Sequence, residues 1–83
     1  MESVGQQLRE ARLEHGLTLE HISARTRIPM KTLRAIECDD FAQFASRFFY
    51  KSFARHFGAA VGLDSGALRD AIQAAAEAMP EPL

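Results

Sequence analysis

Residues 16–37 read GLTLEHISARTRIPMKTLRAIE, a stretch with the start and stop signals of two short helices joined at a sharp angle. Gly16 suits the left-handed backbone that ends a preceding helix, and Thr18 is a helix N-cap whose hydroxyl accepts a free backbone N–H. The turn falls on residues 26–28. Pro29 fits the first turn of the next helix, because its missing N–H costs nothing there. The stretch predicts a helix-turn-helix.

The two motif helices carry further signals of how they pack. Leu17 and Ile22 flank the first cap at the spacing of a hydrophobic staple, which sets the angle at which the chain enters the helix. Ser23 is small and lies on the same side, so another helix backbone can come close there. In the second motif helix, Leu33 and Ile36 share one face. We expect these apolar positions to lie in the core.

Length and composition describe one small folded domain. The chain has 83 residues, of which 47% are hydrophobic and 25% are charged, values that do not fit a disordered chain. The formal net charge is -1, which argues against binding nucleic acid through phosphate neutralisation alone. No apolar run approaches the ~20 residues of a membrane helix, and the N-terminus lacks the apolar segment of a signal peptide. We therefore expect a soluble, cytoplasmic chain.

Helical periodicity continues before the motif. From the N-cap Ser3 to about Glu14, the residues Val4, Leu8 and Ala11 fall on one face. The other side of this helix is polar and is expected to face water; it carries Gln7, Arg9, Glu10, Arg12 and Glu14. This is the pattern of an amphipathic first helix.

After the motif the chain reads ECDDF at residues 37–41, an acidic exit in which Phe41 and, beyond it, Phe44 are expected to anchor a loop over the core. Ser46 signals the start of the longest helix, which runs to Val61.

A last helix is expected to begin after Asp64 or Ser65 and to stop before Pro80. Its core face carries three apolar residues, Leu68, Ile72 and Ala75. The sequence thus predicts an all-α, five-helix bundle, with a helix-turn-helix domain at residues 1–79 and a tail at residues 80–83.

The helix from Ser46 to Val61 carries more apolar surface than a small core needs. At about 100° per residue, its apolar side chains fill an arc wider than the usual core stripe of ~100°. One edge holds the better core candidates, which are Tyr50, Ala54, Phe57 and Val61. The other edge holds Phe49, Phe53 and His56, and Phe48 lies further round, near Arg55 and Ser52.

Two interpretations of these aromatic residues are open. In the first, all four Phe side chains of the helix pack inside, as aromatics at helical spacing mostly do. In the second, Phe49 and Phe53 form a partly exposed ridge, flanked by Lys51 and Arg55, of the kind found at protein interface hot spots. Tyr50, a better core candidate by its edge of the helix, could also lie at the rim of such an interface.

A family resemblance runs without a gap from about Val4 to Leu68. It is carried by VGQQLREARLEHGLTLEHISARTRI at residues 4–28, KTLRAIECDDF at 31–41 and RFFYKSFARHFGAAVGLD at 47–64. These stretches are similar to the cytoplasmic helix-turn-helix domain of the RodZ family of bacterial cell-shape proteins. The resemblance implies a five-helix, lambda-repressor-like domain on the cytoplasmic face of the inner membrane, at the N-terminus of a single-pass membrane protein. It also implies docking on the actin-like filament protein MreB through fourth-helix aromatics that correspond to Phe49 and Phe53.

Three departures from the family pattern fall on or near the fourth helix. Phe44 and Ala45 stand in place of a usual Leu-Pro pair, Ser52 in place of a usual Gly, and Gly58 where Ala is frequent. The changes are mild for the fold. They bear on how closely a partner can approach along the helix.

The alternative function is that of a DNA-binding transcriptional regulator, whose second motif helix would read the major groove. The positive patch that would contact phosphates, or else form a solvated face, consists of Arg25, Arg27, Lys31 and Arg34. Pro29 and Met30 occupy reading positions but offer no hydrogen bond to a base edge, which weakens sequence-specific readout. The acids at the far end of this helix would repel a nucleic-acid backbone; they are Glu37, Asp39 and Asp40.

An enzyme has little support. The three histidines, His15, His21 and His56, are not spaced as metal ligands, and Cys38 is the only cysteine and lies beside acids that disfavour its thiolate. We expect no catalytic residue, metal, cofactor or small-molecule substrate. The leading expectation is a docking domain for MreB with contact residues Phe49, Phe53, Tyr50, Lys51, Arg55 and His56.

Overall fold

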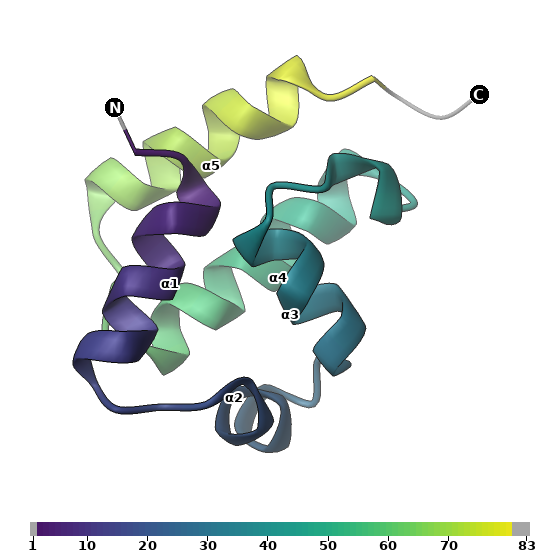
Figure 1. Ribbon diagram of the computed structural model, residues 1–83. Helices are drawn as coiled ribbons and strands as arrows, with labels where there is room; N and C mark the ends of the chain where they lie inside the picture. Colours follow the sequence, from purple (N-terminus) through teal and green to yellow (C-terminus); the bar gives the residue numbers. More distant parts are fainter. Residues whose placement is uncertain (1, 81–83) are drawn as a thin grey trace.

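The computed structural model describes residues 2–80, which form five α-helices, one short 3-10 helix and no strand (Figure 1). The elements are α1 (Val4–Glu14), α2 (Leu19–Thr26), α3 (Met30–Glu37), η1 (Phe41–Gln43), α4 (Arg47–Ala60) and α5 (Gly66–Ala78). In Figure 1, α1 and α3 lie in front of α4, while α2 closes one end of the bundle and α5 crosses the other. The predicted all-α, five-helix fold is confirmed. Of the predicted tail, residues 81–83 lie outside the described residues, as does Met1.

Side-chain caps begin four of the helices, as predicted. The hydroxyls of Ser3, Thr18, Ser46 and Ser65 each accept a hydrogen bond from the backbone N–H three residues later, over 3.1 to 3.2 Å. Ser65, rather than Asp64, therefore opens the last helix. Each cap satisfies one of the donors that a helix N-terminus leaves free. At the other ends, Gly16 and Gly62 adopt positive φ angles of 66° and 73°.

The turn of the helix-turn-helix is held by side-chain hydroxyls. The Ser23 hydroxyl donates to the carbonyl of Ile28 over 2.7 Å, so this residue ties α2 to the turn. Thr26 donates to the carbonyl of Ile22 and accepts from the Ile28 N–H. Pro29 lies one residue before α3, at its N-cap, and not inside the first turn.

The core is built on α4, whose predicted core edge is sealed. Tyr50, Ala54, Phe57 and Val61 are each 0% exposed. Around them lie the predicted apolar faces of the other helices, which comprise Val4, Leu8, Ala11, Ile22, Leu33, Ile36, Leu68 and Ile72. On α5, Ala76 is fully buried, whereas Ala75 is only partly buried against the core. The prediction of Ala75 was therefore off by one position on that face.

The loop before α4 covers the core through two phenylalanines, as predicted. Phe44 is buried and Phe41 is partly buried against the core. Both rings meet the Tyr50 ring edge-on, with centroid distances of 5.3 and 5.2 Å. This edge-to-face arrangement is the one that aromatic quadrupoles favour. The aromatic residues therefore fix the entry of the chain into α4.

Arg12 does not face water, contrary to the prediction. Its guanidinium contacts Glu37 through two N–H groups, with Nε 2.6 Å from Oε2 and Nη2 3.2 Å from Oε1, and it donates to the Leu17 carbonyl through Nη1. The two side chains are only 12% and 8% exposed. This ion pair joins α1, the loop after it and the end of α3. Because burial makes an unpaired charge costly, loss of either partner would be strongly destabilising.

Two glycines allow close backbone approaches between elements. A Cβ on Gly5 would collide with the backbone carbonyls of Ile36 and Glu37, so α1 packs directly against the end of α3. A Cβ on Gly58 would lie 2.7 Å from the Leu63 carbonyl oxygen and 2.8 Å from the Leu68 side chain. Gly58, one of the departures from the RodZ pattern, is thus required by the tight connection from α4 to α5.

Candidate protein-docking site

The predicted aromatic ridge, defined as Phe49 and Phe53, lies on α4 outside the sealed core. Phe49 is 46% exposed, and Phe53 is partly buried against the core. Their rings are stacked, with centroids 6.0 Å apart and planes 19° from parallel. The Ser46 cap holds the backbone N–H of Phe49, so the ridge begins on an ordered first turn. The structure therefore favours the partly exposed arrangement over the one with every Phe inside.

Phe48 extends the exposed aromatic surface of the first turn of α4. It is 69% exposed, and its ring meets the Phe49 ring edge-on at 5.6 Å. Within residues 2–80, the one further large hydrophobic residue with an exposed side chain, besides Phe48 and Phe49, is Leu13. Phe48 was absent from the predicted contact residues because the helical wheel places it beside Arg55 and Ser52, on a side that reads as polar.

Tyr50 is a core residue and is not available to a partner. Its side chain is fully buried, and its hydroxyl has no hydrogen-bond partner among the described residues. Burial raises the pKa of this hydroxyl well above its usual range, and the negative charge of Asp39 adds to the effect. The inclusion of Tyr50 among the predicted contact residues was therefore wrong.

Lys51, Arg55 and His56 lie beside a groove between α4 and α5, which we call the α4–α5 groove. Its lining consists of Phe48, Lys51, Ser52, Arg55, His56, Ala59, Asp64, Arg69, Ile72 and Gln73. The ammonium of Lys51 reaches toward α5, where the amide oxygen of Gln73 lies 3.5 Å away. The prediction that Lys51 and Arg55 flank the ridge is therefore corrected, because both belong to the groove side of α4. The α5 side of the groove was not foreseen, since nothing in the sequence indicates how α5 lies across α4.

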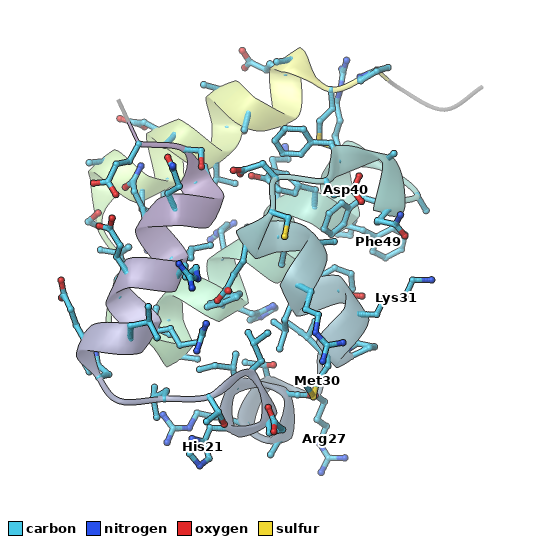
Figure 2. All side chains as sticks on the ribbon, viewed as in Figure 1. His21, Arg27, Met30, Lys31, Asp40 and Phe49 are labelled. Carbon is cyan, nitrogen blue, oxygen red and sulfur yellow. The ribbon has the colours of Figure 1, made fainter. Side chains whose placement is uncertain are left out.

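The four cations predicted to contact nucleic acid all remain at the surface. Arg25, Arg27, Lys31 and Arg34 are exposed on α2, the turn and α3. Figure 2 shows Arg27, Met30 and Lys31 on the same side of the view as Phe49. The residues at the start of α3 are still Pro29 and Met30, which carry no group that hydrogen-bonds to a base edge.

Two of the three acids that were expected to repel a nucleic acid at the end of α3 have partners within the fold. Glu37 is paired with Arg12, and a carboxylate oxygen of Asp39 accepts the Gly5 N–H over 2.9 Å. Asp40 alone of the three is exposed. Of the three charges, that of Glu37 is thus offset by a cation, and the main case against base readout rests on the start of α3.

The remaining polar candidates lie at the ends of helices. His15 closes α1 with its Nδ1 2.9 Å from the Ala11 carbonyl, and His21 Nδ1 accepts the Thr18 N–H at the start of α2. Cys38 is exposed at the end of α3. Within residues 2–80, no three His, Cys, Asp or Glu side chains gather as a metal site would require. No helix in that range has the length and apolarity needed to cross a membrane.

Comparison with known proteins places this geometry in a family. A family model described as a helix-turn-helix domain matches residues 7–68. The cytoskeleton protein RodZ of Streptococcus pneumoniae is 39% identical over 69 residues, which make up 83% of this chain and 25% of that protein. The chain therefore spans about a quarter of the length of this curated relative.

The fold has a solved counterpart. YmfM of Staphylococcus aureus, described as a candidate DNA-binding membrane protein, matches with a TM-score of 0.81 and 28% identity, over 96% of this chain and 94% of that one. The five helices, the family match and the RodZ relative agree with one another. The chain therefore belongs to the helix-turn-helix domain family, and within it to the RodZ-like domains.

Proposed function

We propose that this domain is a non-catalytic docking module that binds the actin-like filament protein MreB through the aromatic ridge, and so takes part in control of bacterial cell shape. The observation that carries the proposal is the stacked Phe49–Phe53 pair, which lies outside the core on the longest helix. The similarity to a cytoskeleton protein supports the class of partner. We also propose that the domain lies on the cytoplasmic side of the membrane, which is supported by the similarity to a cytoskeleton protein and to YmfM, described as a membrane protein.

The ridge offers enough apolar area for an energetic anchor. A phenylalanine side chain buries about 150 Å² or more at an interface. Because Phe49 is 46% exposed, covering it removes on the order of 70 to 100 Å² from water, worth about 2 kcal/mol. That is the size of an interface hot spot. The rings are already stacked, so little side-chain freedom is lost on binding.

Cations near the ridge suit an acidic partner surface. Arg27 and Lys31 are exposed and lie on the same side of the view as Phe49 in Figure 2, whereas Lys51 and Arg55 belong to the groove side of α4. Charges at the rim of an interface raise the association rate more than the affinity. We therefore assign specificity to the ridge and steering to the cations.

Co-sedimentation of the purified domain with polymerised MreB tests the proposal. Phe49→Ala should weaken binding about tenfold or more, because it removes an anchor worth about 2 kcal/mol. The matched control is Phe48→Ala, which removes an equally large exposed ring on the groove side and should leave co-sedimentation nearly unchanged. Circular dichroism should show the same helix content in both variants.

A second variant guards against a purely structural effect. Phe53 packs partly against the core, so Phe53→Ala lowers both binding and thermal stability, whereas Phe49→Ala should affect binding alone. Undiminished co-sedimentation of a folded Phe49→Ala, Phe53→Ala double variant would overturn the proposal. Equal losses from Phe48→Ala and Phe49→Ala would also contradict it, because general stickiness of the helix would then explain the binding.

A further inference from the structure

We propose that the α4–α5 groove is a second docking site, separate from the ridge, for a short acidic peptide segment that carries apolar side chains. The groove combines an exposed aromatic ring, a buried aliphatic floor and an excess of positive charge. This combination matches one kind of occupant better than any other. Apolar side chains would enter beside Phe48, and carboxylates would meet the cations along α4.

The charge of the groove is not balanced by its own residues. Arg69 is already paired with Asp64, with Nη2 3.1 Å from Oδ1, so the acid in the lining is occupied. In residues 2–80, Lys51 and Arg55 form no ion pair, and the contact of Lys51 is with the neutral amide of Gln73. The chain as a whole carries a net charge of -1, so this local excess of cations is not a general property of its surface. An incoming carboxylate would therefore find two cations without acidic partners.

Glu77 of α5 contacts Gln73, one of the lining residues. The Glu77 carboxylate accepts a hydrogen bond from the Gln73 amide nitrogen over 2.9 Å, and it is not part of the lining. Within the lining itself, the three basic side chains of Lys51, Arg55 and Arg69 outnumber the one acid, Asp64. The field at the groove mouth stays positive, which favours acidic over basic segments.

The apolar part of the groove has an exposed wall, the Phe48 ring, and a buried floor, the Ile72 side chain. Phe48 is 69% exposed, whereas Ile72 is 1% exposed and forms part of the core. An apolar side chain seated between them would cover the Phe48 ring without disturbing the core. Such a combination of an aromatic wall and nearby charges is typical of sites that bind short peptides.

The groove is separable from the ridge by helix geometry. At about 100° per residue, Lys51 and Arg55 lie on the far side of α4 from Phe49 and Phe53, and Phe48 stands between the two surfaces. The ridge can therefore be altered while the groove stays intact, and the reverse also holds. This proposal does not depend on MreB being the partner of the ridge.

Fluorescence anisotropy with a labelled hexapeptide of alternating Glu and Leu tests the site. We expect saturable binding that weakens at least about tenfold in a Lys51→Glu, Arg55→Glu variant and several-fold in Phe48→Ala. The matched control is Arg25→Glu, Arg34→Glu, which makes the same change in net charge at exposed positions on α2 and α3 and should leave binding within about twofold. Phe49→Ala, the ridge variant, should also leave peptide binding unchanged.

Peptide variants separate the two parts of the recognition. Replacing Leu by Ser should weaken binding as Phe48→Ala does, and replacing Glu by Lys should abolish it. The proposal is overturned if no saturable binding is seen, if the α2 and α3 control loses as much affinity as the groove variant, or if inorganic phosphate at similar concentration displaces the peptide. Loss of peptide binding in Phe49→Ala would also overturn it, because the ridge would then be the peptide site.

Discussion

Three consecutive residues at the start of α4 have three different surroundings. Phe48 is 69% exposed, Phe49 is 46% exposed and Tyr50 is 0% exposed. Each residue turns the side chain by about 100°, so neighbours in the chain point to the groove, to the ridge and to the core in turn. The polar member of the three is the buried one. Its hydroxyl gains nothing from burial, since it has no hydrogen-bond partner among the described residues.

Tyr50→Phe should therefore stabilise the domain. Removing a buried hydroxyl without a partner raises the free energy of unfolding by about 1 kcal/mol, because its desolvation penalty disappears while the ring packing is kept. Urea denaturation at neutral pH measures the difference. A fall in stability of 1 kcal/mol or more would contradict this account of the hydroxyl.

The same substitution has an expected pH dependence. Burial raises the pKa of Tyr50 in the folded state above the ordinary value of 10.0 that the unfolded chain has. Above pH 10 the unfolded state loses this proton before the folded state does, so the stability of the natural protein falls as pH rises. The advantage of Tyr50→Phe should therefore grow above pH 10. An advantage that stays constant from pH 7 to alkaline pH would show that the folded and unfolded pKa values are alike.

At the scale of the elements, the turn between α2 and α3 uses a non-glycine residue in a left-handed conformation. Arg27 has a φ of 62°, and its N–H donates to the Ser23 carbonyl over 2.8 Å. A side chain in this region is disfavoured by about 1 kcal/mol, because Cβ crowds the backbone carbonyl. The turn tolerates the cost because the hydroxyls of Ser23 and Thr26 hold its geometry.

Arg27→Gly should raise the free energy of unfolding by about 0.5 to 1 kcal/mol, since glycine adopts this conformation without strain. The matched control is Arg25→Gly in the last turn of α2, which removes the same charge from a helical position and should lower stability by a similar amount. Thermal denaturation of the two variants side by side checks the signs. A loss of stability in Arg27→Gly as large as that in Arg25→Gly would contradict the strain argument.

At the scale of the whole molecule, the charges are arranged for local contacts and not for wrapping a nucleic acid. Ten Lys and Arg face eleven Asp and Glu, and four exposed cations lie on α2, the turn and α3. Several of the other cations are committed to acids within the fold, as in the pairs of Arg12 with Glu37 and Arg69 with Asp64. Readout of DNA is therefore not favoured.

Titration with a random duplex of about 20 base pairs should show weak binding at low salt and no saturation near about 0.2 M salt, because few phosphates are neutralised. Lys31→Ala and Arg34→Ala should reduce the low-salt binding further, while co-sedimentation with MreB is kept. Saturable duplex binding near 0.2 M salt that Arg34→Ala removes would instead establish the DNA-binding function.

The helices and their faces followed from local chemistry. A cap hydroxyl reaches an N–H only three residues away, and a glycine stop depends on its own φ, so the roles of Ser3, Thr18, Ser46 and Gly16 could be predicted from the sequence alone. The burial of Ala54, Phe57 and Val61 followed in the same way, from residue spacing. These features depend on contacts within one turn of helix, which sequence distance describes well.

The surfaces of the molecule depended on how separate elements pack. A helical wheel gives the angle of a side chain but not the helix that covers that angle, so it did not decide that Tyr50 is core, that Phe48 is exposed or that Lys51 faces α5. The Arg12–Glu37 pair joins residues 25 apart, and no local pattern indicates such a contact. Burial and long-range pairing arise from the placement of whole helices, which is why the ridge could be proposed from the sequence whereas the groove required the fold.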